Sequence, residues 1–106
     1  MEKKGILRLK KDGGGYRHYI ELQNGKEDDI HCGDMLEVQL GRYVETEDWG
    51  RMEPGPWVGG RYESILCSEN PTAQLIIGEF YPCAGFTGEV MSCKLPLGIT
   101  VRRPKK

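Results

Sequence analysis

The sequence predicts an all-β protein, folded as one domain into a small barrel or a rolled antiparallel sheet of SH3-like or OB-like size. Three observations support this prediction. Short segments alternate apolar and polar residues with the period of a half-buried strand. Fifteen glycines and six prolines divide the chain into short pieces. No window shows a helical period with capping residues, although one helical turn could form around residues 62–69.

The first two strands are expected at Gly5–Leu9 and Tyr16–Leu22, separated by a turn at glycines 13–15. In the second of these, Ile20 and Leu22 fall on one face. Asn24 and Gly25 form a favoured reversal pair, but the charged residues that follow, 26–29, are expected to be a solvated loop rather than a returning strand.

The centre of the fold is expected at the run from Ile30 to Asp34 and the alternating segment 35–40 behind it. Leu36, Val38 and Leu40 share one face of that segment. A tight turn at Gly41 and Arg42 is predicted to lead into a second extended run, 43–49, which completes a hairpin.

The rest of the chain is predicted as short strands between breakers. Residues 52–56, with two prolines and a glycine, are expected to interrupt the chain. The strands are expected at 57–62, 73–77, 89–93 and 97–101, with a loop at 81–85.

The composition is that of a globular cytoplasmic protein. Hydrophobic residues make up 38% and charged residues 29% of the 106 residues. No apolar run is long enough to span a bilayer. Charges at Arg8 and Lys10 interrupt the amino-terminal apolar stretch, so we expect no signal peptide. The four cysteines are then expected to be reduced.

The cysteines and histidines predict neither a metal site nor a catalytic one. The four cysteines stand singly, with no Cys-x-x-Cys pair that would place two zinc ligands on one turn. His31 and Cys32 are adjacent, so on a strand they would face opposite sides, with Cys32 expected in the core and His31 at the surface. His18 could approach Cys32 from another strand with Asp34 orienting it, but nothing in the sequence requires this. We expect no enzyme activity and no cofactor.

The net charge of −1 conceals a segregation of charge along the chain. Residues 1–20 carry six basic and two acidic groups, and residues 94–106 carry five basic groups and no acidic one. If the first and last strands are neighbours, both basic ends form one face, which would suit RNA or DNA. The candidate nucleic-acid-binding residues are Arg8, Lys10, Lys11, Arg17, Arg102 and Arg103.

The middle of the chain, in contrast, is acidic. Residues 21–53 carry ten acidic and three basic groups. An acidic hairpin with exposed aromatic residues can occupy a basic groove on a partner protein. The candidate partner-binding residues are Glu45, Glu47, Asp48, Trp49 and Trp57.

These motifs resemble a family of small bacterial and mobile-element domains of unknown function. The resemblance is carried by the Ile-His-Cys-Gly-Asp turn at 30–34 with Glu37-Val38 after it, and by the closing Gly-Ile-Thr-Val-Arg at 98–102. It extends over residues 5–49 and 97–102, and residues 54–93 look like an insertion. Where the family has a basic residue after the threonine of the return strand, this chain has Glu47. The resemblance implies a small β fold in phages, plasmids or conjugative elements, and it implies no catalytic residue.

The leading hypothesis is therefore a non-catalytic inhibitor that binds a host defence protein or ribonucleoprotein, such as a nucleic-acid-guided nuclease. In this it would be similar to anti-CRISPR proteins. One alternative is a small nucleic-acid-binding barrel, whose affinity would fall steeply with salt. The other is a sponge for small nucleotide signals, with the ligand in the mouth of the barrel.

Overall fold

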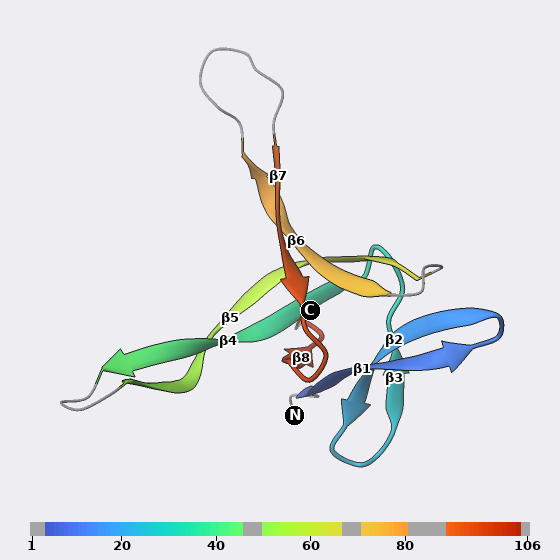
Figure 1. Cartoon of the computed structure of the whole chain (residues 1–106), viewed down its shortest axis with the longest axis horizontal. Coiled ribbons are helices and arrows are strands. Elements are labelled where there is room, and N and C mark those ends of the chain that lie inside the picture. The colour runs from blue at the N-terminus through green and yellow to red at the C-terminus, as the bar shows by residue number, and fades with distance from the viewer. Residues whose placement is uncertain (1–3, 46–49, 67–70, 81–88, 105–106) are drawn as a thin grey trace.

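A computed structural model describes residues 4–45, 50–66, 71–80 and 89–104. The described residues form an all-β fold without a helix, in which eight strands build a single antiparallel sheet (Figure 1). The strands are β1 (Lys4–Asp12), β2 (Gly15–Leu22), β3 (Glu27–Asp29), β4 (Met35–Glu45), β5 (Gly50–Ile65), β6 (Thr72–Phe80), β7 (Glu89–Leu95) and β8 (Thr100–Arg102). In the part of the chain described, no helix is long and apolar enough to cross a membrane.

The sheet is rolled but not closed. Its strand order is β3-β2-β1-β8-β4-β5-β6-β7, so β1 and β8 are neighbours, as expected for the first and last strands of a small barrel. His18 on β2 nevertheless contacts Tyr62 on β5, although three strands lie between β2 and β5 in this order. The sheet must curl for these two side chains to meet, and β3 and β7 remain as its edges.

The core fills the inside of this roll. Among the described residues, ten buried apolar side chains belong to it, from β1, β2, β4, β5, β6, β7 and β8 and from the residue after β3. They are Leu7, Ile20, Ile30, Leu36, Val38, Tyr62, Ala73, Leu75, Leu95 and Val101. Tyr62, Ala73 and Leu75 come from segment 54–93, so the segment predicted to be an insertion supplies part of the common core.

The predicted turn at Gly41 and Arg42 is wrong. Strand β4 passes through both residues and continues to Glu45, and residues 46–49 lie outside those described. A register shift occurs here instead: Gln39 pairs with Trp57 and Gly41 with Pro54, so two residues of β5 oppose Leu40. Leu40 lies opposite this β-bulge and beyond the part of β4 that pairs with β8, and it is 41% exposed although it alternates with the buried Leu36 and Val38.

The predicted interruption at residues 52–56 is also wrong, because all five residues belong to β5. Pro56 lies in the bulge, and among the described residues this part of β5 pairs only with β4, which leaves its other edge without a ladder there. A proline costs little on such an edge because its missing N–H has no ladder partner to lose. Residues 62–65 are strand as well, so no helical turn begins at 62.

A third correction concerns residues 27–29, which form β3 rather than a solvated loop. They return from the Asn24–Gly25 turn to pair with β2, with Tyr19 opposite Asp29 and Glu21 opposite Glu27. Gly25 has a φ of 85°, and the Asn24 side chain accepts a hydrogen bond from the Lys26 N–H. The reversal pair therefore acts as a hairpin turn, and the charge of the returning strand is compatible with its edge position.

Two long hairpins extend beyond the core. Figure 1 shows the β4–β5 hairpin and the β6–β7 hairpin leaving the centre of the molecule in different directions. The radius of gyration is 16.1 Å, against about 13 Å for a compact domain of this length. We call the outer described parts of these hairpins the β4–β5 arm, residues 40–45 and 50–54, and the β6–β7 arm, residues 77–80 and 89–91.

Candidate binding surfaces

The predicted basic residues lie together at the joined ends of the chain, but most of them are ion-paired within the molecule. Arg103 makes the densest set of contacts. Its guanidinium donates to both carboxylate oxygens of Asp28 at 3.1 Å, to Asp34 Oδ2 at 2.8 Å and to the carbonyl of Asp29 at 2.9 Å. Arg103 therefore joins the residue after β8 to β3 and to the turn after it.

Asp34 shows how these contacts act on a carboxyl group. Burial tends to raise the pKa of Asp34. The His31 N–H, which donates to its carboxylate at 3.0 Å, and the Arg103 guanidinium outweigh burial and hold that pKa below its ordinary value. Asp34 is therefore a structural anion at neutral pH, with its charge satisfied inside the protein.

The other predicted basic residues follow the same pattern. Lys10 bonds to Asp29 at 2.7 Å and to Glu27 at 3.0 Å, and these two hydrogen bonds raise the pKa of its ammonium. The other ion pairs are Arg17 with Asp12 at 2.9 Å, Arg8 with Glu21 at 3.9 Å and Arg102 with Glu37 at 2.8 Å. Lys11 is exposed and makes no ion pair with another described residue.

Of the predicted partner-binding residues, Trp57 and Glu45 are described. Trp57 is half-buried, and the guanidinium of Arg102 lies 3.8 Å from the centre of its ring in a cation–π contact. One face of this tryptophan is thus occupied by its own chain. Glu45 is exposed at the end of β4. Glu47, Asp48 and Trp49 lie outside the described residues.

The turn at 30–34 is not the site of a Cys–His pair. Cys32 was predicted to lie in the core, but it is exposed, and its Sγ lies 3.8 Å from the carbonyl of Ser64. His31 is exposed as expected. Gly33 has a φ of 94° and its N–H bonds to the carbonyl of Tyr62, so the turn serves to attach the end of β3 to β5. No group of three or more metal-ligating side chains occurs within the described ranges.

A buried polar pair, not singled out from the sequence, lies deeper in the roll. His18 Nδ1 is 2.6 Å from the Tyr62 hydroxyl, and the two side chains are 1% and 0% exposed. Burial lowers the pKa of His18 and raises the pKa of Tyr62, so both are neutral at pH 7. The burial of His18 could have been predicted from the alternation of β2, because residue 18 falls on the same face as Ile20 and Leu22.

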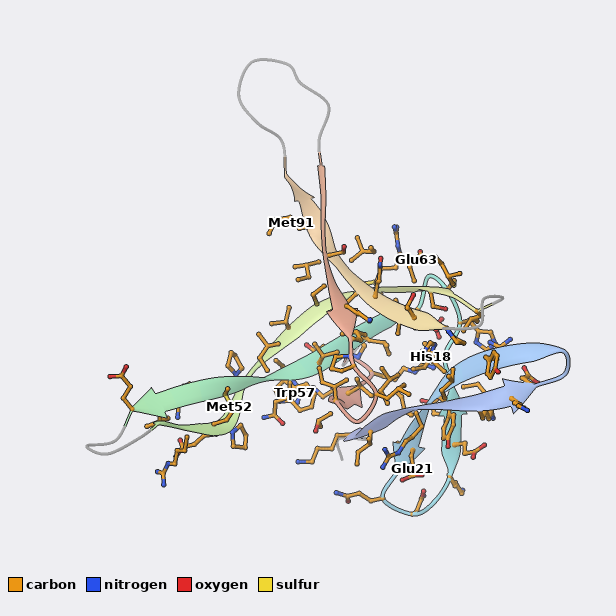
Figure 2. The ribbon with its side chains drawn as sticks, viewed as in Figure 1. His18, Glu21, Met52, Trp57, Glu63 and Met91 are labelled. Carbon is orange, nitrogen blue, oxygen red and sulfur yellow. The ribbon has the colours of Figure 1, made fainter. Side chains whose placement is uncertain are left out.

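Large apolar side chains are exposed along both arms. Met52 on β5 is 66% exposed and Leu40 on β4 is 41% exposed. On the other arm, Ile77 and Met91 are 43% and 54% exposed. Figure 2 shows Met52 and Met91 on separate arms, away from the core. Among the described residues no third strand pairs with these parts of the two hairpins, so these side chains are open to contact with a partner.

Comparison of the chain with models of known families, with curated proteins and with solved structures finds no match in any of the three.

Proposed function

We propose that this protein is a non-catalytic binding protein that docks onto a macromolecular partner through its β4–β5 arm. The observation that carries the proposal is the exposed Met52 on an arm that lies outside the core. An isolated two-stranded ribbon is marginally stable in water, and contact with a partner would cover its apolar side chains.

The pairing register divides the arm into two different faces, because residues paired across an antiparallel ladder share a face. One face is charged: Arg42 and Arg51 both pair with Glu53, at 3.5 and 2.7 Å. The other face carries Met52, whose side chain lies over Gly41, and the register places Glu45 on this face too. An apolar anchor on the same face as an acidic group suits a partner surface that is apolar with basic groups at its rim.

We further propose that the partner is a host defence protein or ribonucleoprotein, with a nucleic-acid-guided nuclease as the specific candidate. The support is the acidic character of residues 45–48, which suits a groove built for nucleic acid, and the resemblance to mobile-element domains. The ion pairs of Arg8, Lys10, Arg17, Arg102 and Arg103 count against the alternative of a nucleic-acid-binding barrel, because their charges are already balanced within the chain.

A tagged pull-down from a bacterial lysate, with and without nuclease treatment, tests the proposal. The wild type is compared with Met52→Asp and Glu45→Lys, and Met91→Asp on the other arm is the matched control. We expect the wild type to capture a protein partner whether or not the lysate is treated with nuclease. The amount captured should fall about tenfold or more with Met52→Asp and stay unchanged with Met91→Asp. The captured partner is then assayed for guided cleavage with added wild-type protein, which should inhibit it.

Two outcomes would contradict the proposal. Equal capture by Met52→Asp and the wild type would remove the β4–β5 arm as the docking surface. Recovery of RNA or DNA alone, lost on nuclease treatment and falling steeply with salt, would favour the nucleic-acid alternative.

A further inference from the structure

Strand β7 ends the sheet order on one side, and its outer backbone edge is free. Among the described residues it pairs with β6 alone, and no hydrogen bond reaches its other edge. The bulge of this hairpin lies in β6, at Ile77, so β7 itself is regular. At the opposite end of the sheet, β3 has only three residues, and Arg103 donates to the carbonyl of Asp29. Over residues 90–93, β7 has no proline, bulge or charge, the features that usually protect an edge strand from pairing.

The backbone groups on this free edge follow from the hydrogen bonds of the neighbouring strands. On β5, Tyr62 directs its N–H and C=O toward residues 33–34, away from β6. Its pair on β6, Leu75, therefore directs its own N–H and C=O toward β7, where it pairs with Cys93. Because successive residues of a strand alternate, the next residue, Ser92, directs its N–H and C=O to the free edge. By the same alternation, the backbone groups of residue 90 also face outward.

The face of β7 that points toward the core remains apolar where it leaves the core. Leu95 is buried, and Cys93 is partly buried against the core cluster. Met91 is the next residue on this face, and it is 54% exposed. Beside it in the bulge of β6, Ile77 is 43% exposed. The apolar surface of the core thus continues onto the β6–β7 arm next to a free backbone edge.

We propose that β7 pairs antiparallel with β7 of a second copy of this chain, about a two-fold axis at Met91. A two-fold axis perpendicular to the sheet makes an antiparallel edge self-complementary, because each copy brings the same N–H and C=O groups in the opposite direction. With the axis at Met91, Ser92 of each copy lies opposite residue 90 of the other. Both residues direct their backbone groups outward, so each such pair exchanges two hydrogen bonds.

The side chains favour a second copy as the occupant of this edge. The axis places Met91 directly opposite its own counterpart, with Ile77 of each copy on the neighbouring strand, so the exposed apolar residues of two arms form one row. No like charges lie opposite each other in residues 90–92, and the net charge of −1 opposes association only weakly. The pairing uses the same edge of both copies, so it closes at a dimer instead of growing. This surface is separate from the β4–β5 arm and does not depend on docking there.

The first test is sedimentation equilibrium of the full chain from about 1 μM to about 300 μM, where the mass should rise from one chain to two. Ser92→Pro should weaken the dimer at least about tenfold, because it removes an outward N–H. It takes no hydrogen bond from the β6–β7 ladder, so the circular dichroism spectrum should stay that of the wild type. Ser92→Ala keeps the N–H and should remain dimeric.

The second test locates the axis. With the axis at Met91, this residue forms a pair without backbone hydrogen bonds, in which the two Cα atoms lie about 4.5 Å apart. That separation allows a disulfide. Met91→Cys should therefore form a covalent dimer with oxidised glutathione, while Met52→Cys, at an exposed position of the other arm, should not exceed the wild type.

A wild type that stays monomeric over this range, or a dimer that Ser92→Pro and Ser92→Ala form equally well, would overturn the proposal. A monomeric wild type whose capture of a partner is lost in Ser92→Pro would assign the edge to a strand of that partner instead. Met52→Asp should dimerise like the wild type while it fails to capture the partner, and Met91→Asp should show the reverse. The failure of partner docking and the failure of self-pairing are therefore distinguishable.

Discussion

At the scale of single residues, the contact between His18 and Tyr62 connects the two halves of the roll. It lies inside the core, where an uncompensated charge is costly. Burial lowers the pKa of His18 below its ordinary value of about 6.5, so the folded protein holds this ring neutral where the unfolded chain would protonate it. The Tyr62 hydroxyl faces the His18 ring in the core, and the exposed Lys94 is among the residues that line an open cavity beside this ring, the His18 cavity.

We predict that stability falls as the pH is lowered through about 6.5. Between the unfolded and folded pKa values the unfolded state binds more protons, so protons favour unfolding. Above pH 6.5 both states are neutral at this site and the effect is absent. The free energy of unfolding, measured with urea at pH 7.5, 6.5 and 5.5, should decline with a slope of up to about 1.4 kcal/mol per pH unit.

The conservative variant His18→Asn is the critical comparison, because the Asn Oδ1 can still accept a hydrogen bond from Tyr62 and does not titrate. It should be less stable than the wild type at pH 7.5 and show a flatter pH slope. His31→Asn, at an exposed position, should keep the wild-type slope. An unchanged slope in His18→Asn would show that another group causes the pH dependence.

At the scale of elements, the approach of β5 to β6 depends on Gly60. A Cβ at this buried glycine would lie 2.5 Å from the carbonyl oxygen of Ile76 and 2.8 Å from Leu75 Cγ. The first contact is with backbone and cannot be relieved by a rotamer change. At the neighbouring Gly59, which is exposed, the nearest atom to a Cβ is Glu37 Cγ at 3.7 Å, an ordinary contact.

Gly60→Ala should therefore destabilise the protein by about 1–3 kcal/mol, the usual cost of overpacking a core. Gly59→Ala should change the unfolding free energy by less than about 1 kcal/mol, because it only restricts the unfolded chain. Chemical denaturation of the two variants side by side measures the difference. Equal stabilities would mean that β5 and β6 separate easily at this point.

Strands β2, β4 and β5 show what the sequence can and cannot predict about the fold. Alternation located the buried faces correctly at Ile20, Leu36 and Val38, because period-two burial is a local property. It failed where a turn signal was overridden by pairing: Gly41 and Pro56 resemble breakers but lie at a bulge that the opposite strand accommodates. The positions of bulges depend on the partner strand, which no local pattern reveals.

At the scale of the whole molecule, the basic ends of the chain fold onto its acidic middle. The sequence showed the segregation, and the β1–β8 pairing that joins the basic ends followed from a general property of small barrels. The partners of Arg102 and Arg103 could not be predicted, because Glu37, Asp28 and Asp34 lie at least 65 residues away along the chain. The His18 cavity likewise appears only when opposite ends of the sheet approach each other.

Arg103 should be the ion-paired residue on which stability depends most, because it holds two carboxylates and a carbonyl from a region about 70 residues distant. We expect Arg103→Ala to lower the unfolding free energy by about 1.5 kcal/mol, at the low end for charged hydrogen bonds because the side chain is 35% exposed. Arg103→Lys should recover only part of the loss, since an ammonium cannot reproduce the two parallel bonds to Asp28.

Arg61→Ala provides the comparison for a surface pair. Arg61 contacts Glu63 at 3.0 Å, but its side chain is 54% exposed, so its loss should cost less than about 0.5 kcal/mol. Urea denaturation of the three variants at low and at high salt measures both effects, and salt should reduce the gap between Arg103→Ala and the wild type. If Arg103→Ala were as mild as Arg61→Ala, the end of the chain would not be held by this contact. The basic surface would then be available to nucleic acid after all.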